Sequence, residues 1–470
     1  MTTPAATPAV TAAQRQVSTL AWVSASLSAL VVSMNLSVMS VAFDALGTSF
    51  PEAKLSTLGW VLSVYTIVFG AFLVPAGRLA DHLGRRRVFL VGLVIFTIAS
   101  LIAAVAPAIW IVIAGRVGQG IGAACLVPST LGLLLDALPV EKRASATAAY
   151  SVLASVGGIA GPTVGAYLVD HGGWRSAFYV APVFALASWF TGWKSLPEHR
   201  SRRTGPLPDL VGAVLVIVSL TALSFGILQS RAWGWTSPKV VSALLLAVVT
   251  VPVFFARCAR HPVPVLPIQL TRIRSFAWSN IASAIYGMST GALLFGIVRF
   301  LRQGWDYSLT DSGAGIIPLA LASMSTASLA GRAGNRFGER AIAAPACVVI
   351  ATGMTFLAFR LNGTPAFWTA WVPGAALIGA GMGITYPMIG SACVRNVEGA
   401  DLSVASATNR MTLQIGNAIG IAIAIAIIGD AKGHDIIDPM RHAFLVMAGL
   451  ALVVGASMTM VGRRSFAQRY

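Results

Sequence analysis

A charged turn between two long apolar runs places the strongest constraint on what this chain can fold into. The turn reads Gly-Arg-Leu-Ala-Asp-His-Leu-Gly-Arg-Arg-Arg, from Gly77 to Arg87. The run before it, Leu58 to Ala80, carries Arg78 as its single charge, and the run after it, Val88 to Ala106, carries none. About 20 apolar residues in a helix span the ~30 Å hydrocarbon core of a bilayer. We therefore expect two membrane helices joined by a turn at a membrane face.

The composition excludes a soluble globular protein. Hydrophobic residues make up 56% of the 470-residue chain, the mean hydropathy is +0.78, and 10% of the residues are Asp, Glu, Lys or Arg. Soluble domains carry about 25% of these charged residues. The net charge of +17 lies in short turns between apolar runs and forms no continuous basic face. It therefore indicates membrane topology and no nucleic-acid partner.

Uncharged or nearly uncharged runs predict an all-α membrane protein with fourteen transmembrane helices. The runs lie at about 20–43, 58–80, 88–106, 109–135, 144–169, 176–194, 210–230, 238–256, 277–298, 312–331, 341–359, 368–391, 402–429 and 442–462. With the amino terminus inside, most of the 33 Lys and Arg residues fall on the inner side. Positive charge in short loops stays cytoplasmic, so both termini are predicted to be cytoplasmic in a multi-pass protein of the cell membrane.

A second copy of the charged turn lies at Gly331 to Arg340 and reads Gly-Arg-Ala-Gly-Asn-Arg-Phe-Gly-Glu-Arg. Two copies indicate an internal duplication of a multi-helix unit. The first copy resembles the cytoplasmic loop signature of the major facilitator superfamily, between the second and third helices, and the second resembles its degenerate repeat. The resemblance implies a conformational gate between two halves. Its residues in the first copy are Gly77, Asp81, Gly84 and Arg85.

The distance between the copies predicts how the helices are divided. The second and tenth spans are eight helices apart, which fits a six-helix half followed by two extra helices. Segments rich in Pro and Arg bound that extra pair. We expect a disordered tail at 1–18, a six-helix bundle at 19–194, loops and two inserted helices at 195–276, and a second six-helix bundle with a short tail at 277–470. This arrangement resembles the fourteen-helix drug:proton antiporters of the superfamily.

Small residues in the fifth span form a second motif. Gly157, Gly161 and Gly165 recur at spacing four on one helix face, and Pro162 bends the helix that carries them. A small-residue stripe allows another helix to pack closely, and tight packing alone would explain it. The sequence around Gly161 and Pro162 also resembles the antiporter signature of exporters in the family. This resemblance adds both residues to the gate and favours export over import.

Polar residues within otherwise apolar spans are the candidates for the substrate pathway. Arg116 lies about two turns inside its span, where an unpaired guanidinium is costly, so it is expected to face the bundle interior. It anchors backbone carbonyls or, by resemblance to the family's fourth-helix motif, takes part in proton transfer. The candidates are Asn35, Ser37, Tyr65, Arg116, Gln119, Tyr286, Asn409, Arg410 and Gln414.

The first span departs from the family pattern at two positions. Proton-coupled members commonly show an Asp where this chain has Asn35, and a Pro where it has Asp44. An amide releases no proton near neutral pH, so Asn35 can bind substrate but cannot carry a proton. The remaining candidates for proton coupling are Asp44 and Asp136. No carboxylate lies in the middle of a span, which favours neutral or anionic amphiphiles over dications as substrates.

The sequence carries no motif of an enzyme. There is no Gly-x-x-x-x-Gly-Lys-Ser/Thr loop, no His-x-x-x-His, no Cys-x-x-Cys and no cluster of nucleophile and base. We therefore expect neither a cofactor nor a metal. The predicted function is secondary export of small amphipathic organic compounds, as in drug or metabolite efflux, by alternating access of a monomer in the lipid bilayer, coupled to protons. The alternative is an uncoupled or differently coupled carrier of a lipid or secondary metabolite, which the Asn35 departure supports.

Overall fold

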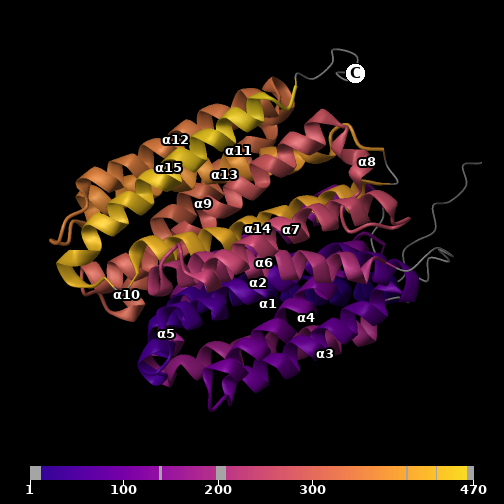
Figure 1. Cartoon of the computed structure of the whole chain (residues 1–470). Helices are drawn as coiled ribbons and strands as arrows, with labels where there is room; N and C mark the ends of the chain where they lie inside the picture. The colour runs from indigo at the N-terminus through magenta and orange to yellow at the C-terminus, as the bar shows by residue number, and fades with distance from the viewer. Residues whose placement is uncertain (1–11, 137–139, 197–207, 399–400, 430, 463–470) are drawn as a thin grey trace, which may run out of the picture.

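The computed structural model describes residues 12–136, 140–196, 208–398, 401–429 and 431–462. Within these ranges the chain is helical and contains no β-strand. Long helices run roughly parallel to one another, with the short helix α8 (Ile268–Thr271) at one end and α10 (Leu309–Ala314) at the other (Figure 1). These two ends are called the α8 end and the α10 end below. Helices suit a bilayer because every backbone N–H and C=O inside them is bonded within the element.

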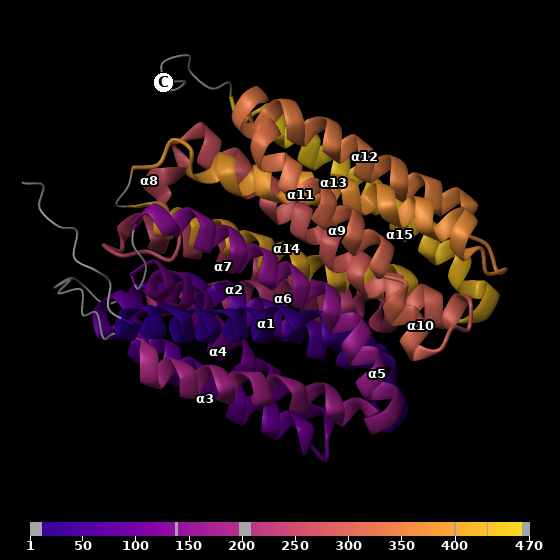
Figure 2. The same ribbon diagram turned by 180° about the vertical axis from the view of Figure 1, so that it is seen from behind.

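The helices from the first part of the chain pack into one bundle. Helix α5 packs along α1, while α3 and α4 pack against each other and against α5 and α2. We call this group the first bundle; it lies on one side of the molecule in both views (Figures 1 and 2). Its members are α1 (Ala12–Ser49), α2 (Leu55–Leu83), α3 (Arg85–Ala104), α4 (Ile109–Asp136) and α5 (Val140–Ser195).

The helices from the last part of the chain form the second bundle on the opposite side (Figures 1 and 2). Here α14 packs on α9, α13 packs on α11 and α12, and α15 packs on α12 and α9. The two bundles meet chiefly where α14 lies along α2. The members are α9 (Arg274–Gly304), α10, α11 (Ile317–Phe337), α12 (Glu339–Arg360), η1 (Phe367–Trp371), α13 (Val372–Val394), α14 (Leu402–Ile428), η3 (Gly433–Ile436) and α15 (Ile437–Thr459).

Two helices form a separate pair beside the seam between the bundles. Helix α6 (Leu210–Trp233) packs on α7 (Pro238–Arg260) and contacts both α2 and α14. Only 17% of the most apolar window of α7 is buried, against 78% for α2. Its apolar side chains therefore face outward, as expected of a helix whose neighbour is lipid.

Twelve of the described helices are long and apolar enough to cross a membrane. They agree with twelve of the predicted runs, and the other two runs, 144–169 and 176–194, fall within α5. Helix α5 is 56 residues long and is broken by non-helical backbone at Gly173 (φ 69°). Helix α1 begins at Ala12, inside the segment that was expected to be a tail.

The two copies of the charged turn have the same backbone geometry. Gly84 ends α2 and precedes α3 with φ 101°, and Gly338 joins α11 to α12 with φ 86°. Positive φ values of this kind are strained for residues with a Cβ, so glycine allows two antiparallel helices to connect without an intervening loop. The internal repeat detected in the sequence therefore corresponds to a repeated helix–turn–helix structure.

Candidate functional site

A polar cluster around Arg116 lies inside the first bundle. Arg116 is fully buried, and its guanidinium donates to the backbone oxygen of Val61 at 2.8 Å and to Gln119 Oε1 at 2.8 Å. It also donates to Asn35 Oδ1. Gln119 in turn donates to Ser100 Oγ at 2.7 Å. These acceptors are all neutral, so the positive charge of Arg116 is stabilised by oxygen dipoles and by no carboxylate among the described residues.

Tyr65 separates this cluster from the centre of the protein. The guanidinium carbon of Arg116 lies 4.3 Å from the centroid of the Tyr65 ring, a cation–π contact. Tyr65 is fully buried, its ring lies 5.8 Å from that of Phe69, and its hydroxyl has no hydrogen-bond partner in the part of the chain that the structure describes. The ring thus touches Arg116 and also faces a cavity.

The central cavity lies between the two bundles and has a volume of about 150 Å³. Helices α1, α2 and α4 of the first bundle and α13 and α14 of the second contribute its wall. The wall is mostly apolar and aromatic, with one guanidinium and one carboxamide. It consists of Ala29, Val32, Ser33, Tyr65, Phe69, Val127, Tyr386, Arg410, Leu413 and Gln414.

Three of the predicted pathway residues line this cavity, and three more lie behind its wall. Tyr65, Arg410 and Gln414 are the lining residues. Arg116, Asn35 and Gln119 form the buried cluster that contacts Tyr65. The other three predicted residues, Ser37, Tyr286 and Asn409, are not among the residues that line the cavity.

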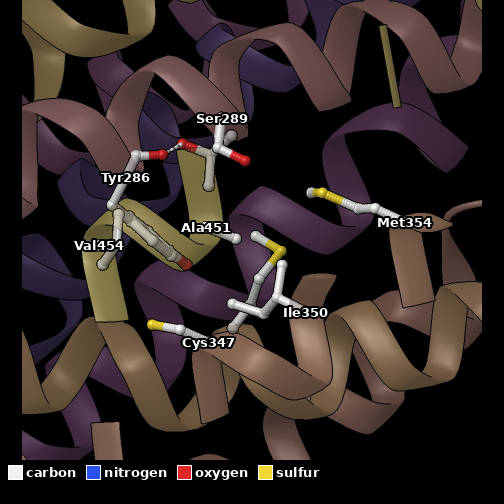
Figure 3. A pocket seen from close by; sticks show the side chains of 9 residues that line it. Tyr286, Ser289, Cys347, Ile350, Met354, Ala451 and Val454 are labelled. Atoms are coloured by element: carbon white, nitrogen blue, oxygen red, sulfur yellow. Dashed lines mark hydrogen bonds between the residues drawn. The ribbon is translucent and has the colours of Figure 1, made fainter. Parts of the chain in front are cut away.

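Ser37 and Asn409 take part in helix packing. The Ser37 hydroxyl donates to backbone oxygens of its own helix α1 and faces α5, while Asn409 accepts a hydrogen bond from Ser283 Oγ on its backbone oxygen at 3.0 Å. Tyr286 points into a small cavity of about 10 Å³ within the second bundle, facing Cys347 and Ile350 of α12 (Figure 3). That volume holds at most about one water molecule.

Tyr286 nevertheless contributes indirectly to the central cavity. Its ring stacks on that of Tyr386 with a centroid distance of 6.1 Å and an interplanar angle of 16°. Tyr386 lines the cavity and was not predicted, although it is a polar aromatic residue in an apolar run, the same signal that drew attention to Tyr286. The stacking fixes the orientation of the Tyr386 ring.

At the α10 end the two bundles are joined by an ion pair. Arg299 Nη1 of α9 lies 3.1 Å from Asp44 Oδ1 of α1, and both side chains are largely buried. Gln303 Nε2 donates to Asp44 Oδ2 at 3.3 Å, and Arg302 Nε lies 3.6 Å from the same oxygen. Nearby, Thr310 donates to Asp170 Oδ2 of α5 at 3.1 Å. Asp44 is thus a bridge between the bundles.

The partners of Asp44 were missed in the sequence. Arg299 directly follows the predicted run 277–298 and therefore lies outside the helix expected from the sequence. Helix α9 continues to Gly304, which keeps Arg299, Arg302 and Gln303 on one helix face beside Asp44. No sequence signal pairs residues this far apart. The second proton candidate, Asp136, ends α4, and its side chain lies outside the described residues.

At the α8 end the first charged turn faces the second bundle. Asp81 Oδ1 accepts from Arg85 Nε at 3.2 Å and Nη2 at 3.1 Å, which joins the end of α2 to the start of α3. A cavity of about 50 Å³ lies against Gly77, Asp81 and Arg85 on one side and against Ser403 at the start of α14 on the other. The predicted gate residues of this turn therefore lie where the bundles approach each other.

The glycine stripe of α5 packs mainly within the first bundle. A Cβ at Gly161 would overlap Ser37 Oγ of α1, and one at Gly157 would lie 3.3 Å from the Cα of Leu30. Pro162 lies at the contact between bundles, because a Cβ added to Gly313 of α10 would lie 2.6 Å from its backbone oxygen. Close packing of α5 on α1 explains why this face carries no larger side chain.

Two helical bundles around a shared central cavity form the architecture of a membrane transporter. The chain belongs to the Major Facilitator Superfamily, whose sequence model matches residues 21–324 and 279–466. The family predicted from the charged turns is therefore confirmed. Membership of this family indicates a transporter and not an enzyme.

Proteins similar to this chain are named for export or drug resistance. The cephamycin export protein CmcT of Amycolatopsis lactamdurans is 30% identical over 444 residues, which cover 90% of this chain and 87% of that protein. The multidrug resistance protein Stp of Mycobacterium tuberculosis is 29% identical over 413 residues, covering 86% and 74%. The probable actinorhodin transporter of Streptomyces coelicolor is 30% identical over 398 residues, covering 82% and 68%.

Solved structures share the fold. A bacterial homologue of the human drug peptide transporters PepT1 and PepT2 superposes with a TM-score of 0.67 at 16% identity, over 94% of this chain and 98% of that one. The human organic anion transporter MFSD10 gives 0.65 at 16% identity, over 95% and 99%. At these identities the likeness establishes the arrangement of helices alone.

Proposed function

We propose that this protein is a secondary exporter of amphipathic organic compounds that works by alternating access. The observation that carries the proposal is the central cavity, whose wall is shared by both bundles while the Asp44–Arg299 pair joins them at the α10 end. A site between two bundles changes the side from which it is reached when the bundles rock against each other. The names of the similar proteins support outward transport of drug-like compounds.

The α8 end is assigned to the cytoplasm. It carries Arg78, Arg85, Arg86 and Arg87 in the first charged turn, as expected of a cytoplasmic loop. Both chain termini then lie in the cytoplasm of a protein of the cell membrane. The cavity-lining residue Arg410 lies eight residues from the start of α14, about 12 Å from the α8 end. Because Asp44 and Arg299 join the bundles at the α10 end, we propose that this is the state that accepts substrate from the cytoplasm.

Fourteen transmembrane helices remain the proposed arrangement. Helix α5 would extend about 84 Å if it were straight, more than two crossings of a ~30 Å core, so its break at Gly173 supplies the fifth and sixth spans. The division is 1–18, 19–194, 195–276 and 277–470. The middle segment contains the α6–α7 pair, which packs outside both bundles. One chain supplies every residue that lines the central cavity, so one monomer is the proposed transport unit.

Proton coupling is proposed to act through Asp44. Its carboxylate pairs with Arg299 and Arg302 and accepts a hydrogen bond from Gln303. A proton on Asp44 would remove the negative charge that attracts the two guanidiniums. The pair between the bundles would then weaken and the α10 end would open. For antiport, this proton must enter from outside and be released to the cytoplasm when the cavity next faces inward, where the Asp44–Arg299 pair forms again. Asp136 is the second candidate.

The alternative is an uncoupled or differently coupled carrier of a lipid or secondary metabolite. It is favoured by Asn35, which fills with a carboxamide the place beside Arg116 where the family resemblance leads us to expect a carboxylate. This cluster holds its positive charge without any titratable acceptor among the described residues. In the alternative, substrate binding alone would move the bundles.

Everted membrane vesicles with an imposed pH gradient test the proposal. Uphill accumulation of an exported compound that collapses when the gradient is dissipated supports proton-coupled export. Equilibration to equal concentrations, with exchange stimulated by substrate on the opposite side, supports the uncoupled carrier. A compound released in chemically altered form would contradict both.

A further inference from the structure

Among the described residues, those that line the central cavity include a positive charge and no acidic side chain. Arg410 is the only charged residue among those that line it. The helices that supply the wall, α1, α2, α4, α13 and α14, contain three acidic residues, namely Asp44, Asp81 and Asp136. Asp81 and Asp136 lie in the last turn of their helices, and Asp44 is paired with Arg299 and Arg302. Neither Asp44 nor Asp81 is among the residues that line the cavity.

The wall presents one unpaired hydrogen-bond donor, the side-chain amide nitrogen of Gln414. Gln414 uses its carbonyl oxygen to accept from Asn417 Nδ2 at 2.9 Å, and its amide nitrogen has no protein partner among the described residues. The Tyr65 hydroxyl and Arg116 Nη2 behind it are buried, and within the described ranges neither has a hydrogen-bond partner. A ligand that offers an oxygen acceptor would satisfy the Gln414 amide, whereas one that offers only N–H donors would leave this amide unpaired. The Tyr65 hydroxyl can donate or accept and does not discriminate between them.

The aromatic part of the wall provides little that would attract a cation. Cations bind aromatic faces, but Arg116 already lies over the Tyr65 ring, and Tyr386 is stacked on Tyr286. A second cation next to Tyr65 would be repelled by the Arg116 guanidinium at short range and low dielectric. The same rings provide apolar surface for the body of an amphipathic molecule.

We propose that the central cavity selects amphipathic organic anions, with an aromatic body against Tyr65, Phe69 and Tyr386 and a carboxylate near Arg410 and the Gln414 amide. This rests on the proposed export function, whose substrate class it names. A cavity of about 150 Å³ accommodates about one aromatic ring. Arg410 and Gln414 lie four residues apart and therefore on one face of α14, so both reach the same anionic group.

A matched set of three ligands tests the charge preference. We would measure binding of 3-phenylpropionate, 3-phenylpropanamide and 3-phenylpropylammonium to the full chain in nanodiscs by calorimetry. The expected order is carboxylate, amide, ammonium, with the carboxylate at least about tenfold tighter than the ammonium ion. An ammonium ion that binds as tightly as the carboxylate, or a carboxylate that does not bind measurably, overturns the proposal.

Two substitutions test the assigned residues. Arg410→Gln is expected to weaken carboxylate binding about tenfold while amide binding changes less than about twofold, and Arg410→Lys should retain most of the preference. Gln414→Glu is expected to weaken carboxylate binding and to strengthen ammonium binding, because the new carboxylate neutralises Arg410 four residues away. Arg360→Gln, an exposed arginine at the end of α12, is the matched control and should change nothing.

The outcomes also separate this inference from the proposed function. Thermal melting shows which variants are folded, and stronger ammonium binding by Gln414→Glu would be a gain that a misfolded protein cannot produce. An unchanged ratio of carboxylate to amide binding in folded Arg410→Gln overturns the assignment. If wild type binds the carboxylate selectively but vesicles do not move it, the anion site stands and the export function fails.

Discussion

Asp44 Oδ1 of α1 and Arg299 Nη1 of α9 lie 3.1 Å apart and join the two bundles at the α10 end. Arg299 also donates to the backbone oxygen of Gly429 at 2.8 Å, so the same guanidinium contacts the end of α14. One carboxylate thus holds together helices that are more than two hundred residues apart in the chain. The charge state of Asp44 is therefore expected to affect the equilibrium between the two access states.

The first prediction is that Asp44→Asn opens the α10 end. Losing a charge-assisted bond of roughly 2 kcal/mol would shift the equilibrium about 30-fold toward the state open at that end. Distances between spin labels on the ends of α1 and α9 would measure the shift. Asp438→Asn is the control, because that carboxylate is 76% exposed and pairs with Arg441 of the same helix. Unchanged distances, together with transport still driven by the pH gradient, would remove Asp44 from the coupling scheme.

The second prediction concerns the buried charge of Arg116. Asn35→Leu removes an acceptor from a fully buried guanidinium, so it is expected to destabilise the protein by about 2 kcal/mol and lower its melting temperature in detergent. Asn35→Asp keeps an acceptor for Arg116 and gives it a negative charge, so this variant should melt at or above the wild-type temperature at pH 7.5. Asn396→Leu, at an exposed position, serves as the control. Equal melting of wild type and Asn35→Leu would contradict the structural role given to this pair.

The third prediction concerns the packing of α5 on α1. Gly161→Ala places a Cβ against Ser37 Oγ, and transport should fall while the protein still inserts into the membrane. Adding Ser37→Ala removes the overlapping oxygen and should restore part of the activity. Gly158→Ala is the matched control, since no atom lies within 4 Å of a Cβ there. Transport assays on the single and double variants decide the matter, and a double variant no better than Gly161→Ala alone would argue against direct contact.

The fourth prediction concerns the gate at the α8 end. Asp81→Asn weakens the pair with Arg85, which is partly exposed and is formed in the state assigned to cytoplasmic access, so a change of about 1 kcal/mol and a roughly fivefold shift away from that state are expected. Spin labels near the end of α2 and near Ser403 of α14 would report it. Glu52→Gln, an exposed change at the other end, should leave these distances unaltered. The gate assignment is wrong if Asp81→Asn behaves in the same way as that control.

Several features of the fold could be predicted from single runs of residues. The alternation of apolar runs and charged turns predicts membrane helices, because a bilayer requires helices of a certain length and each turn must reach water. The repeated turns at Gly84 and Gly338 could also be predicted, because a turn that needs a positive φ favours glycine at that position. The family confirmed by comparison was recognisable from these residues.

The residues of the candidate site could be predicted from the sequence only in part. Polarity within apolar runs identified Tyr65, Arg410 and Gln414, which line the cavity, but the same criterion selected Ser37 and Tyr286, which do not. A polar residue in a membrane helix can face a substrate pathway or satisfy its own backbone and neighbours. The rotation of each helix about its axis decides between these two roles, and periodicity within one helix does not specify that rotation relative to another bundle.

The sequence by itself determined the helical membrane fold, the duplicated turns, the family and the absence of a carboxylate at mid-membrane depth. Only the tertiary structure decided that Asp44 meets Arg299, that Arg116 is held by Asn35 and Gln119, and that Tyr386 faces Tyr65 across one cavity. The physical reason is the separation along the chain over which each signal acts. Hydropathy and turn geometry act within about 20 residues, whereas these contacts depend on how helices distant in the chain pack against one another.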